Sequence, residues 1–189
     1  MLPHIDISQT RIETERLILR PFALSDLNDF FAYACVPGVG EMAGWPHHQS
    51  IETTKSILDM FIAEKNVLAI FHKESSRVIG SFGFHDSWAN YENAYKDKRM
   101  CEIGYVLSKD YWGQGLMPEA VKAAVRYAFD DFNLDLIGVC HFTDNRQSQR
   151  VIEKCGFTPV STGIFHAKQL GCTFEEIRYL RMRPDSIRD

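Results

Sequence analysis

The chain has 189 residues, 45% of them hydrophobic, and a formal net charge of −4. This length and composition predict one domain, residues 1–189, with a single sizeable core. The lack of a basic excess argues against direct nucleic acid binding, because phosphates need lysine and arginine to neutralise them. No apolar run approaches the about 20 residues of a membrane helix, and the polar start is unlike a signal peptide. We therefore expect a cytoplasmic protein that does not bind membranes.

Cysteine and histidine placement argues against a metal site. The five cysteines are scattered and include no Cys-x-x-Cys pair, so neither a zinc site nor a disulfide framework is predicted. Cys155 is a candidate nucleophile, but its place beside Phe157 at a helix end favours a small buried side chain. The adjacent His47 and His48 cannot easily share one metal ion, so no metal is expected. Lining of a substrate groove stays open for this pair.

Hydrophobic periodicity and turn residues predict alternating strands and helices in the first half of the chain. Serines at two helix starts are the predicted caps. In chain order, the predicted elements are a strand over 14–22, a helix capped by Ser25, a loop over 35–49, a helix from Ser50 to about Lys65, strands over 67–72 and 78–85 joined as a hairpin, and a loop over 87–99.

The second half predicts strands on both sides of single helices. Its predicted elements are a strand over 102–107, a helix over about 117–129, a strand over 136–142, a helix from Asn145 to Cys155, and strands over 157–160 and 173–182. The order β-α-α-β-β-β-α-β-α-β-β predicts an α/β (α+β) protein with a mixed sheet and helices on its faces.

A glycine turn between strand and helix is the most informative feature of the chain. Gly113 and Gly115 let the backbone approach a ligand, and the helix that follows offers free N–H groups and a positive dipole end to a phosphate. A Gly-x-Gly alone also fits an ordinary tight turn. Pro118 stands where a dinucleotide fingerprint needs its third glycine, which argues against a nicotinamide-binding enzyme. No Gly-Lys-Ser/Thr follows, so a nucleotide P-loop is not predicted either.

Three segments together resemble GNAT N-acetyltransferases, most of all the ribosomal-protein acetyltransferases of the RimJ/RimL type. They are TERLILRPF, EIGYVLSKDYWGQGLMPEA and DNRQSQRVIEKCGF, in this order, within residues 14–182. The resemblance implies a mixed, mostly antiparallel central sheet with two splayed central strands and helices on both faces. It also implies acetyl-coenzyme A as cosubstrate and no metal.

The resemblance further implies where the coenzyme binds. The pantetheine arm would lie between the splayed strands, held by the backbone of Val106 and Leu107, and the Val106 N–H would polarise the thioester carbonyl. Many relatives carry Gln or Arg where this chain has Asp110, which leaves a side-chain contribution to phosphate binding open. The pyrophosphate would be held by the N–H groups across Gly113, Gln114, Gly115, Leu116 and Met117.

Three polar residues are the candidates for catalysis and coenzyme contact. Glu102 lies four residues before Val106, where some GNAT enzymes carry a catalytic glutamate. A carboxylate in a dry groove suits removal of a proton from an ammonium group, directly or through water; an ordinary solvent-facing or ion-paired strand residue is the alternative. Asn145 caps a helix, and in the resembling enzymes the matching residue contacts the coenzyme. Ser148 matches a serine that contacts the coenzyme and protonates the departing thiolate, a role that a tyrosine takes in other members.

The resemblance implies transfer of an acetyl group from acetyl-coenzyme A to a primary amine. The first-choice acceptor is the N-terminal amine of a protein, such as a ribosomal protein. Two alternatives stay open, namely acetylation of a small-molecule amine (a polyamine, an amino acid or an aminoglycoside-like drug) and a coenzyme A-binding regulatory module without turnover. The acceptor is the expected partner, and a homodimer is left open.

Overall fold

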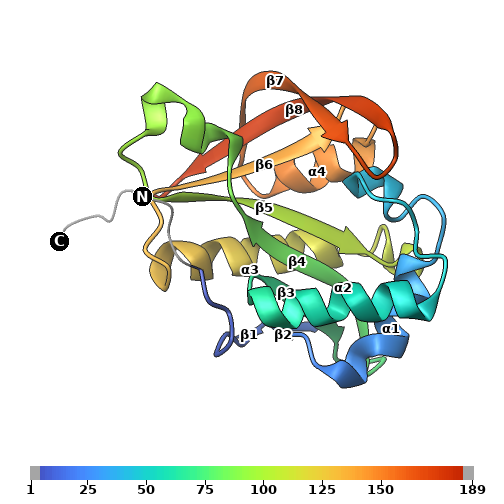
Figure 1. The fold of residues 1–189 in the computed structure, drawn as a ribbon. Helices are drawn as coiled ribbons and strands as arrows, with labels where there is room; N and C mark the ends of the chain where they lie inside the picture. Colours follow the sequence, from blue (N-terminus) through green and yellow to red (C-terminus); the bar gives the residue numbers. More distant parts are fainter. Residues whose placement is uncertain (1–4, 185–189) are drawn as a thin grey trace.

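The computed structural model describes residues 5–184, which build a curved eight-stranded sheet flanked by helices (Figure 1). Short 3-10 turns occupy parts of the connections, including residues 88–95 of the predicted loop. In chain order the elements are β1 (Ile12–Glu13), β2 (Leu17–Pro21), α1 (Leu27–Ala34), α2 (Ile51–Glu64), β3 (Val67–His72), β4 (Arg77–His85), β5 (Met100–Leu107), α3 (Leu116–Asp130), β6 (Leu136–Phe142), α4 (Arg146–Lys154), β7 (Thr158–Ala167) and β8 (Cys172–Met182).

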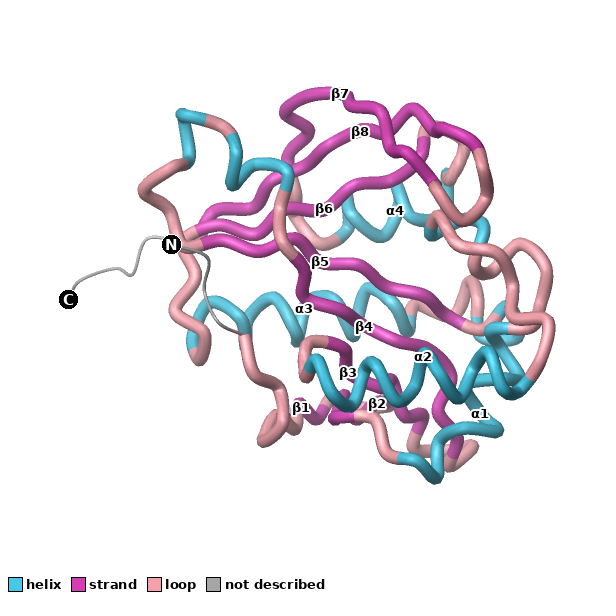
Figure 2. The backbone as a smooth tube through the Cα atoms, in the orientation of Figure 1, coloured by secondary structure: helices cyan, strands magenta, loops and turns pink. Residues whose placement is uncertain are grey.

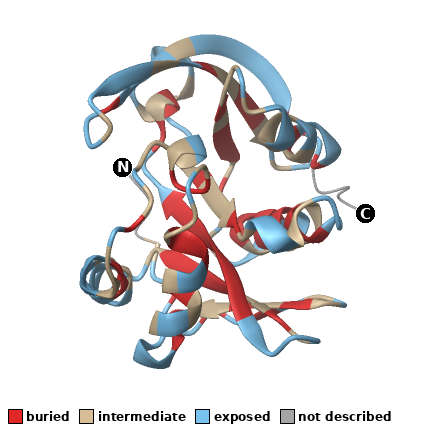
Figure 3. Ribbon diagram, turned by 90° about the vertical axis from the view of Figure 1, so that its right-hand side faces the viewer, coloured by how far each residue is buried: buried red, intermediate tan, exposed pale blue. Residues whose placement is uncertain are grey.

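The strands follow the order β1-β2-β3-β4-β5-β6-β8-β7, and the β5–β6 contact is the parallel one in an otherwise antiparallel sheet. Buried side chains of α3 and α4 pack on one face, and those of α1 and α2 pack on the other. Figure 3 shows the buried strands between these two helical layers. The predicted mixed, mostly antiparallel sheet with helices on both faces is therefore confirmed.

Strands β5 and β6 separate soon after they meet. They pair over three positions, from Met100 opposite Leu136 to Glu102 opposite Gly138. Beyond that point β5 continues to Leu107 and β6 to Phe142 without pairing to each other, and the two strands diverge in Figures 1 and 2. Since backbone groups of a strand need partners, this gap offers unpaired N–H and C=O groups to a ligand.

Two N-terminal predictions need correction. The strand predicted over 14–22 is shortened to β2, and β1 precedes it, because residues 14–16 form the turn between the two strands, where the Leu17 N–H donates to Thr14 Oγ1 at 2.9 Å. Ser25 does not cap α1. Its place is inside a short 3-10 turn, and Asp26 instead accepts a hydrogen bond from the Ala23 N–H at 2.8 Å.

The remaining elements follow their patterns except near the C-terminus. Ser50 caps α2 as predicted, accepting from the Thr53 N–H at 3.2 Å. Gly156, in the left-handed region with φ 75°, follows α4 as predicted. The strand predicted over 157–160 extends to Ala167. The prediction was too short because β7 is an edge strand exposed at nearly every position. Such a strand lacks the alternation of buried and exposed residues by which strands are recognised.

Candidate active site

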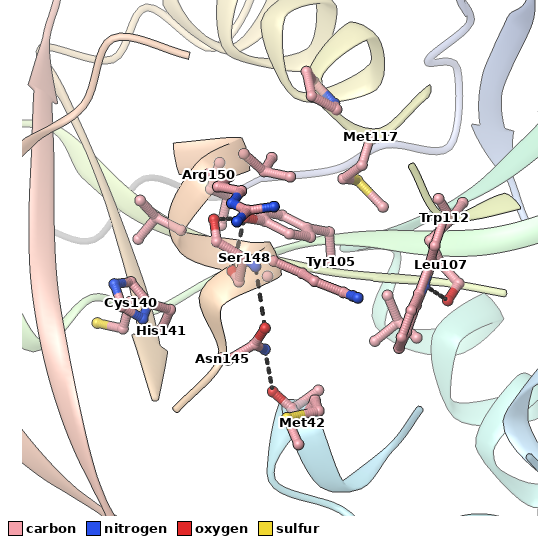
Figure 4. A pocket seen from close by; sticks show the side chains of 18 of the residues that line it. Met42, Tyr105, Leu107, Trp112, Met117, Cys140, His141, Asn145, Ser148 and Arg150 are labelled. Carbon is pink, nitrogen blue, oxygen red and sulfur yellow. Dashed lines mark hydrogen bonds between the residues drawn. The ribbon is translucent and has the colours of Figure 1, made fainter. Parts of the chain in front are cut away.

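A cavity of about 480 Å³ follows the gap between β5 and β6. Its walls come from these two strands, the glycine turn, the start of α4, and the connection between α1 and α2 around Met42 (Figure 4). The cavity thus joins the second and third of the three segments that the sequence singled out. Of the predicted site residues, it is lined by Glu102, Val106, Leu107, Gly113, Gly115, Leu116, Met117, Asn145 and Ser148.

The glycine turn presents unpaired N–H groups to this cavity. Gly113 and Gly115 adopt the left-handed region, with φ of 76° and 77°, which side chains rarely tolerate. Gly115 is the N-cap of α3 and offers no capping side chain, so the first N–H groups of the helix remain free for an anion. Gln114 does not line the cavity, and its side chain donates to the Asp110 carbonyl at 3.0 Å.

Arg16 fastens the glycine turn to the N-terminal segment. Its Nη1 donates to the Gln114 carbonyl at 3.0 Å, and its Nε donates to Glu119 Oε2 at 2.8 Å. Thr14 completes the arrangement with a 2.6 Å hydrogen bond to Glu119 Oε1. Sequence reasoning did not assign roles to Arg16 or Glu119. Both lie inside segments that carry the resemblance, which was the available signal.

Strand pairing decides which backbone groups of β5 face the gap. The Ser108 N–H donates to the Ile79 carbonyl at 2.8 Å, toward β4, and the Val106 carbonyl lies against Gly80 of β4. Antiparallel pairing alternates along a strand, so the backbone of Val106 faces β4, whereas that of Tyr105 and Leu107 faces the gap. The side chain of Val106 still lines the cavity. The expected backbone contacts therefore suit Leu107, and Tyr105 in place of Val106.

Of the gap-facing carbonyls on β5, that of Leu107 already has a protein partner. Trp112 Nε1 donates to it at 2.8 Å (Figure 4). The Leu107 N–H is therefore the group that this residue offers to a ligand. Trp112, like Tyr105, is a cavity residue that the sequence reasoning did not single out.

Asn145 and Ser148 lie together at the start of α4, as predicted. Asn145 Oδ1 accepts from the Ser148 N–H at 3.1 Å, and its Nδ2 donates to the Met42 carbonyl across the cavity at 3.3 Å (Figure 4). Ser148 Oγ lies 2.9 Å from the hydroxyl of Tyr105. Burial raises the pKa of Tyr105, so its phenol keeps its proton. The pair Tyr105–Ser148 is a chain of two hydroxyls that reaches the gap.

Glu102 is a partly buried carboxylate at the closed end of the gap. Burial first, and then repulsion by Glu176, raise its pKa to about 7. A hydrogen bond with Cys140 and one from the Trp88 backbone N–H act in the opposite direction. A base whose pKa lies near neutral pH is suited to proton removal. The residue therefore has the environment that the sequence prediction required.

Two other sequence candidates lie apart from this chemistry. Burial raises the pKa of Cys155 to about 11, which disfavours the thiolate that a nucleophile needs. His47 forms a hydrogen bond with Glu41 at 2.7 Å and His48 with Thr54 at 2.8 Å, and neither histidine lines the cavity.

Within residues 5–184, no group of three or more His, Cys, Asp or Glu side chains is arranged to hold a metal ion. In the same range, no helix has the length and apolar character needed to cross a membrane.

Comparison with known proteins identifies the family. Over 178 residues the chain is 31% identical to the uncharacterized N-acetyltransferase YoaA of Bacillus subtilis, covering 92% of this chain and 97% of that protein. The ribosomal-protein-S5-alanine acetyltransferase from Vibrio fischeri has a TM-score of 0.71 and 19% identity, covering 93% of this chain and 98% of that chain. The microcin self-immunity acetyltransferase MccE, in complex with acetyl-CoA and AMP, has a TM-score of 0.75 and 19% identity, covering 94% and 100%. Residues 16–158 match the family described as Acetyltransferase (GNAT) domain, so the chain belongs to the GNAT acetyltransferases, as its three segments predicted.

Proposed function

We propose that the protein transfers the acetyl group of acetyl-coenzyme A to a primary amine. The observation that carries this proposal is the gap between β5 and β6, which connects the glycine turn with Glu102. A seat for phosphate, a channel with unpaired backbone groups and a carboxylate with a raised pKa follow one another along a single cavity. Positioning an amine against a thioester in such a channel supplies much of the rate.

The coenzyme would be held mainly by backbone groups. The N–H groups at the start of α3 suit the pyrophosphate, and those of Tyr105 and Leu107 suit the pantetheine arm. Arg150, labelled in Figure 4, and Lys154 are exposed cations on α4 that line the cavity. They would neutralise further phosphate charge. The acetyl-CoA complex of MccE, a protein of the same fold, supports acetyl-coenzyme A as the cosubstrate.

The reaction needs one base and one acid. The amine nitrogen attacks the carbonyl carbon of the thioester, so that a C–N bond forms and the C–S bond breaks. Glu102 takes the proton that the ammonium group must lose. Ser148 gives a proton to the departing thiolate, and the second proton that the nitrogen loses as the amide forms restores it through Tyr105, its hydrogen-bond partner at 2.9 Å. A gap-facing backbone N–H of β5 stabilises the negative charge on the carbonyl oxygen.

The acceptor we put first is the N-terminal amine of a protein, such as a ribosomal protein. The fold shared with the ribosomal-protein-S5-alanine acetyltransferase supports this choice at the level of architecture. A small amine is the alternative acceptor. A regulatory module that binds coenzyme A without turnover is the alternative function.

An acetyl-transfer screen tests the proposal. The purified protein is mixed with acetyl-coenzyme A and, separately, with peptides from ribosomal-protein N-termini, polyamines, amino acids and aminoglycosides. We expect release of free thiol with the peptides and an acetyl group on their N-terminal amine by mass spectrometry. Thiol release with small amines alone would move the acceptor to that class. Coenzyme binding by calorimetry without thiol release from any acceptor would contradict enzymatic transfer.

A further inference from the structure

Glu176 is a buried carboxylate that the proposed mechanism does not use. It lies on β8 opposite Phe142, is 6% exposed, and still borders the cavity. Strand pairing places it on the same sheet face as Cys140 of β6 and Glu102 of β5, because alternate residues share a face. A buried charge is costly unless it is paired, so its presence here calls for a partner and a use.

Arg178 is that partner, and three neighbours fix its position. Its Nε donates to Glu176 Oε1 at 2.8 Å. Its guanidinium carbon lies 4.9 Å from the centre of the Trp88 ring, a cation–π contact. Gly163 of β7 leaves room for it, because a Cβ at that position would overlap the guanidinium group. Within residues 5–184, no hydrogen bond reaches Glu176 Oε2, so one oxygen of this fixed carboxylate remains available.

The charges of both Glu176 and Arg178 act on Glu102. The groups that face it are Cys140 from β6, Glu176 and Arg178 from β8, the backbone N–H of Trp88, and His85, which lies opposite in the β4–β5 register. Glu176 disfavours ionisation of Glu102, whereas Arg178 favours it. With Glu102 ionised, the two carboxylates outweigh the single positive charge of Arg178, so this face of the cavity attracts a cation.

We propose that Glu176, fixed by Arg178, is a positioning residue of the acceptor site that draws the protonated amine to Glu102. The proposal rests on the proposed function, since it assumes that Glu102 receives the proton of the amine. Gly163 and Trp88 act indirectly, by holding the guanidinium group against Glu176. The substrate class that this arrangement selects is a primary amine that arrives as an ammonium ion.

Variants with opposite expected shifts test the proposal. Glu176→Gln removes the negative charge that opposes ionisation of Glu102, so the acidic limb of the kcat/KM profile moves to lower pH by about one unit. The same variant attracts the ammonium group less, so KM for the acceptor rises more than kcat falls. Arg178→Met moves the same limb to higher pH. Gly163→Ala keeps the charge but displaces the guanidinium group, and shifts the limb in the direction of Arg178→Met. Glu175→Gln is the matched control, because Glu175 is exposed on the opposite face of the same strand.

A direct titration separates this proposal from the function on which it rests. Carbon-13 NMR of protein labelled at the glutamate carboxyls, with Glu102→Gln for assignment, follows Glu102 without any turnover. We expect opposite displacements of its titration in Glu176→Gln and Arg178→Met, with none in Glu175→Gln. Folded variants that titrate like the parent would overturn the positioning role even where acetyl transfer is active. An absence of acetyl transfer with the expected displacements would instead reject the proposed function.

Discussion

At the scale of single residues, the site depends on burial that changes the chemistry of ordinary side chains. Glu102 is a common strand residue until its removal from water and the nearby Glu176 raise its pKa to about 7. Tyr105 likewise stays protonated because it is buried, and its hydroxyl can relay a proton to Ser148 only while it receives another in exchange. Both changes arise from neighbours on other strands and helices.

Glu102→Gln should reduce turnover by roughly 10²-fold near neutral pH, the usual contribution of a positioned base. The loss should shrink at alkaline pH, because a free amine no longer needs a base. The measurement is a pH–rate profile of parent and variant with the same acceptor. Two profiles that run parallel would remove Glu102 from this role.

Ser148→Ala should lower kcat by roughly 10²-fold while acetyl-coenzyme A affinity stays unchanged, because the backbone seat and Asn145 remain. Tyr105→Phe deletes the partner hydroxyl and should cause a smaller loss. Steady-state kinetics, calorimetry and a thermal melt of each variant check this. A normal rate with stability reduced by about 1 kcal/mol would assign Ser148 to the start of α4 alone.

At the scale of elements, the proposed coenzyme seat is a turn whose shape depends on contacts with the N-terminal segment. The turn between β5 and α3 needs two left-handed glycines, and Arg16 fixes its shape through Gln114 and Glu119. The N-terminus of α3 then faces the cavity without a capping side chain. Local backbone geometry and one long-range clamp together create the anion site.

Gly113→Val should abolish binding of acetyl-coenzyme A, and Gly171→Val is its matched control. Both glycines have positive φ (76° and 65°), and a Cβ on either would meet no protein atom within 4 Å. Each substitution should therefore cost about 1–2 kcal/mol of backbone strain, a similar amount at the two positions. Gly171 lies in the β7–β8 turn, away from the coenzyme seat. Calorimetry that shows equal affinities in the two folded variants would contradict the assigned seat.

At the scale of the whole molecule, the sheet lacks pairing between β5 and β6 beyond Glu102, and this leaves the gap in which binding is proposed. The buried cluster under α3 and α4 includes side chains of both strands, such as Ile103 of β5 and Val139 of β6, and supports them where no hydrogen bonds join them. The cluster under α1 and α2 packs on β3 and β4 and reaches β5 at Val106. A buried carboxyl group such as that of Glu102 lowers the free energy of unfolding when it is ionised.

The pH dependence of stability measures this cost. The pKa of Glu102 is about 7 in the folded protein against 4.5 for the ordinary side chain, so the folded state binds this proton more tightly. Its contribution is complete below pH 4.5 and is lost as the pH rises through 7. Relative to the parent, Glu102→Gln should therefore gain up to about 3 kcal/mol between about pH 5 and pH 8. Denaturant unfolding at several pH values checks this, and a constant difference between the two proteins would contradict it.

Much of the fold could be predicted because local patterns report local structure. The strand, glycine turn and helix around Gly113 are encoded within one contiguous stretch, and Ser50 marks the start of α2 by a bond three residues away. The edge strand β7 was predicted too short because neither of its faces is buried, so no alternation records it. Ser25 was assigned as the cap of α1 but lies in a 3-10 turn that Asp26 closes by accepting from the Ala23 N–H, and both are residue types that favour turns.

The sequence by itself determined the family, nearly all of the order of elements, and the glycine turn between β5 and α3, and it named Glu102, Asn145 and Ser148 as candidates. Only the tertiary structure decided what these residues meet. Tyr105 reaches Ser148 across 43 positions of sequence, and the pairing order β5-β6-β8 brings Glu176 and Arg178 to the face of Glu102. The physical reason is that hydrogen bonds within a turn or helix have a fixed spacing in sequence, whereas the partners of a strand are set by packing over the whole sheet.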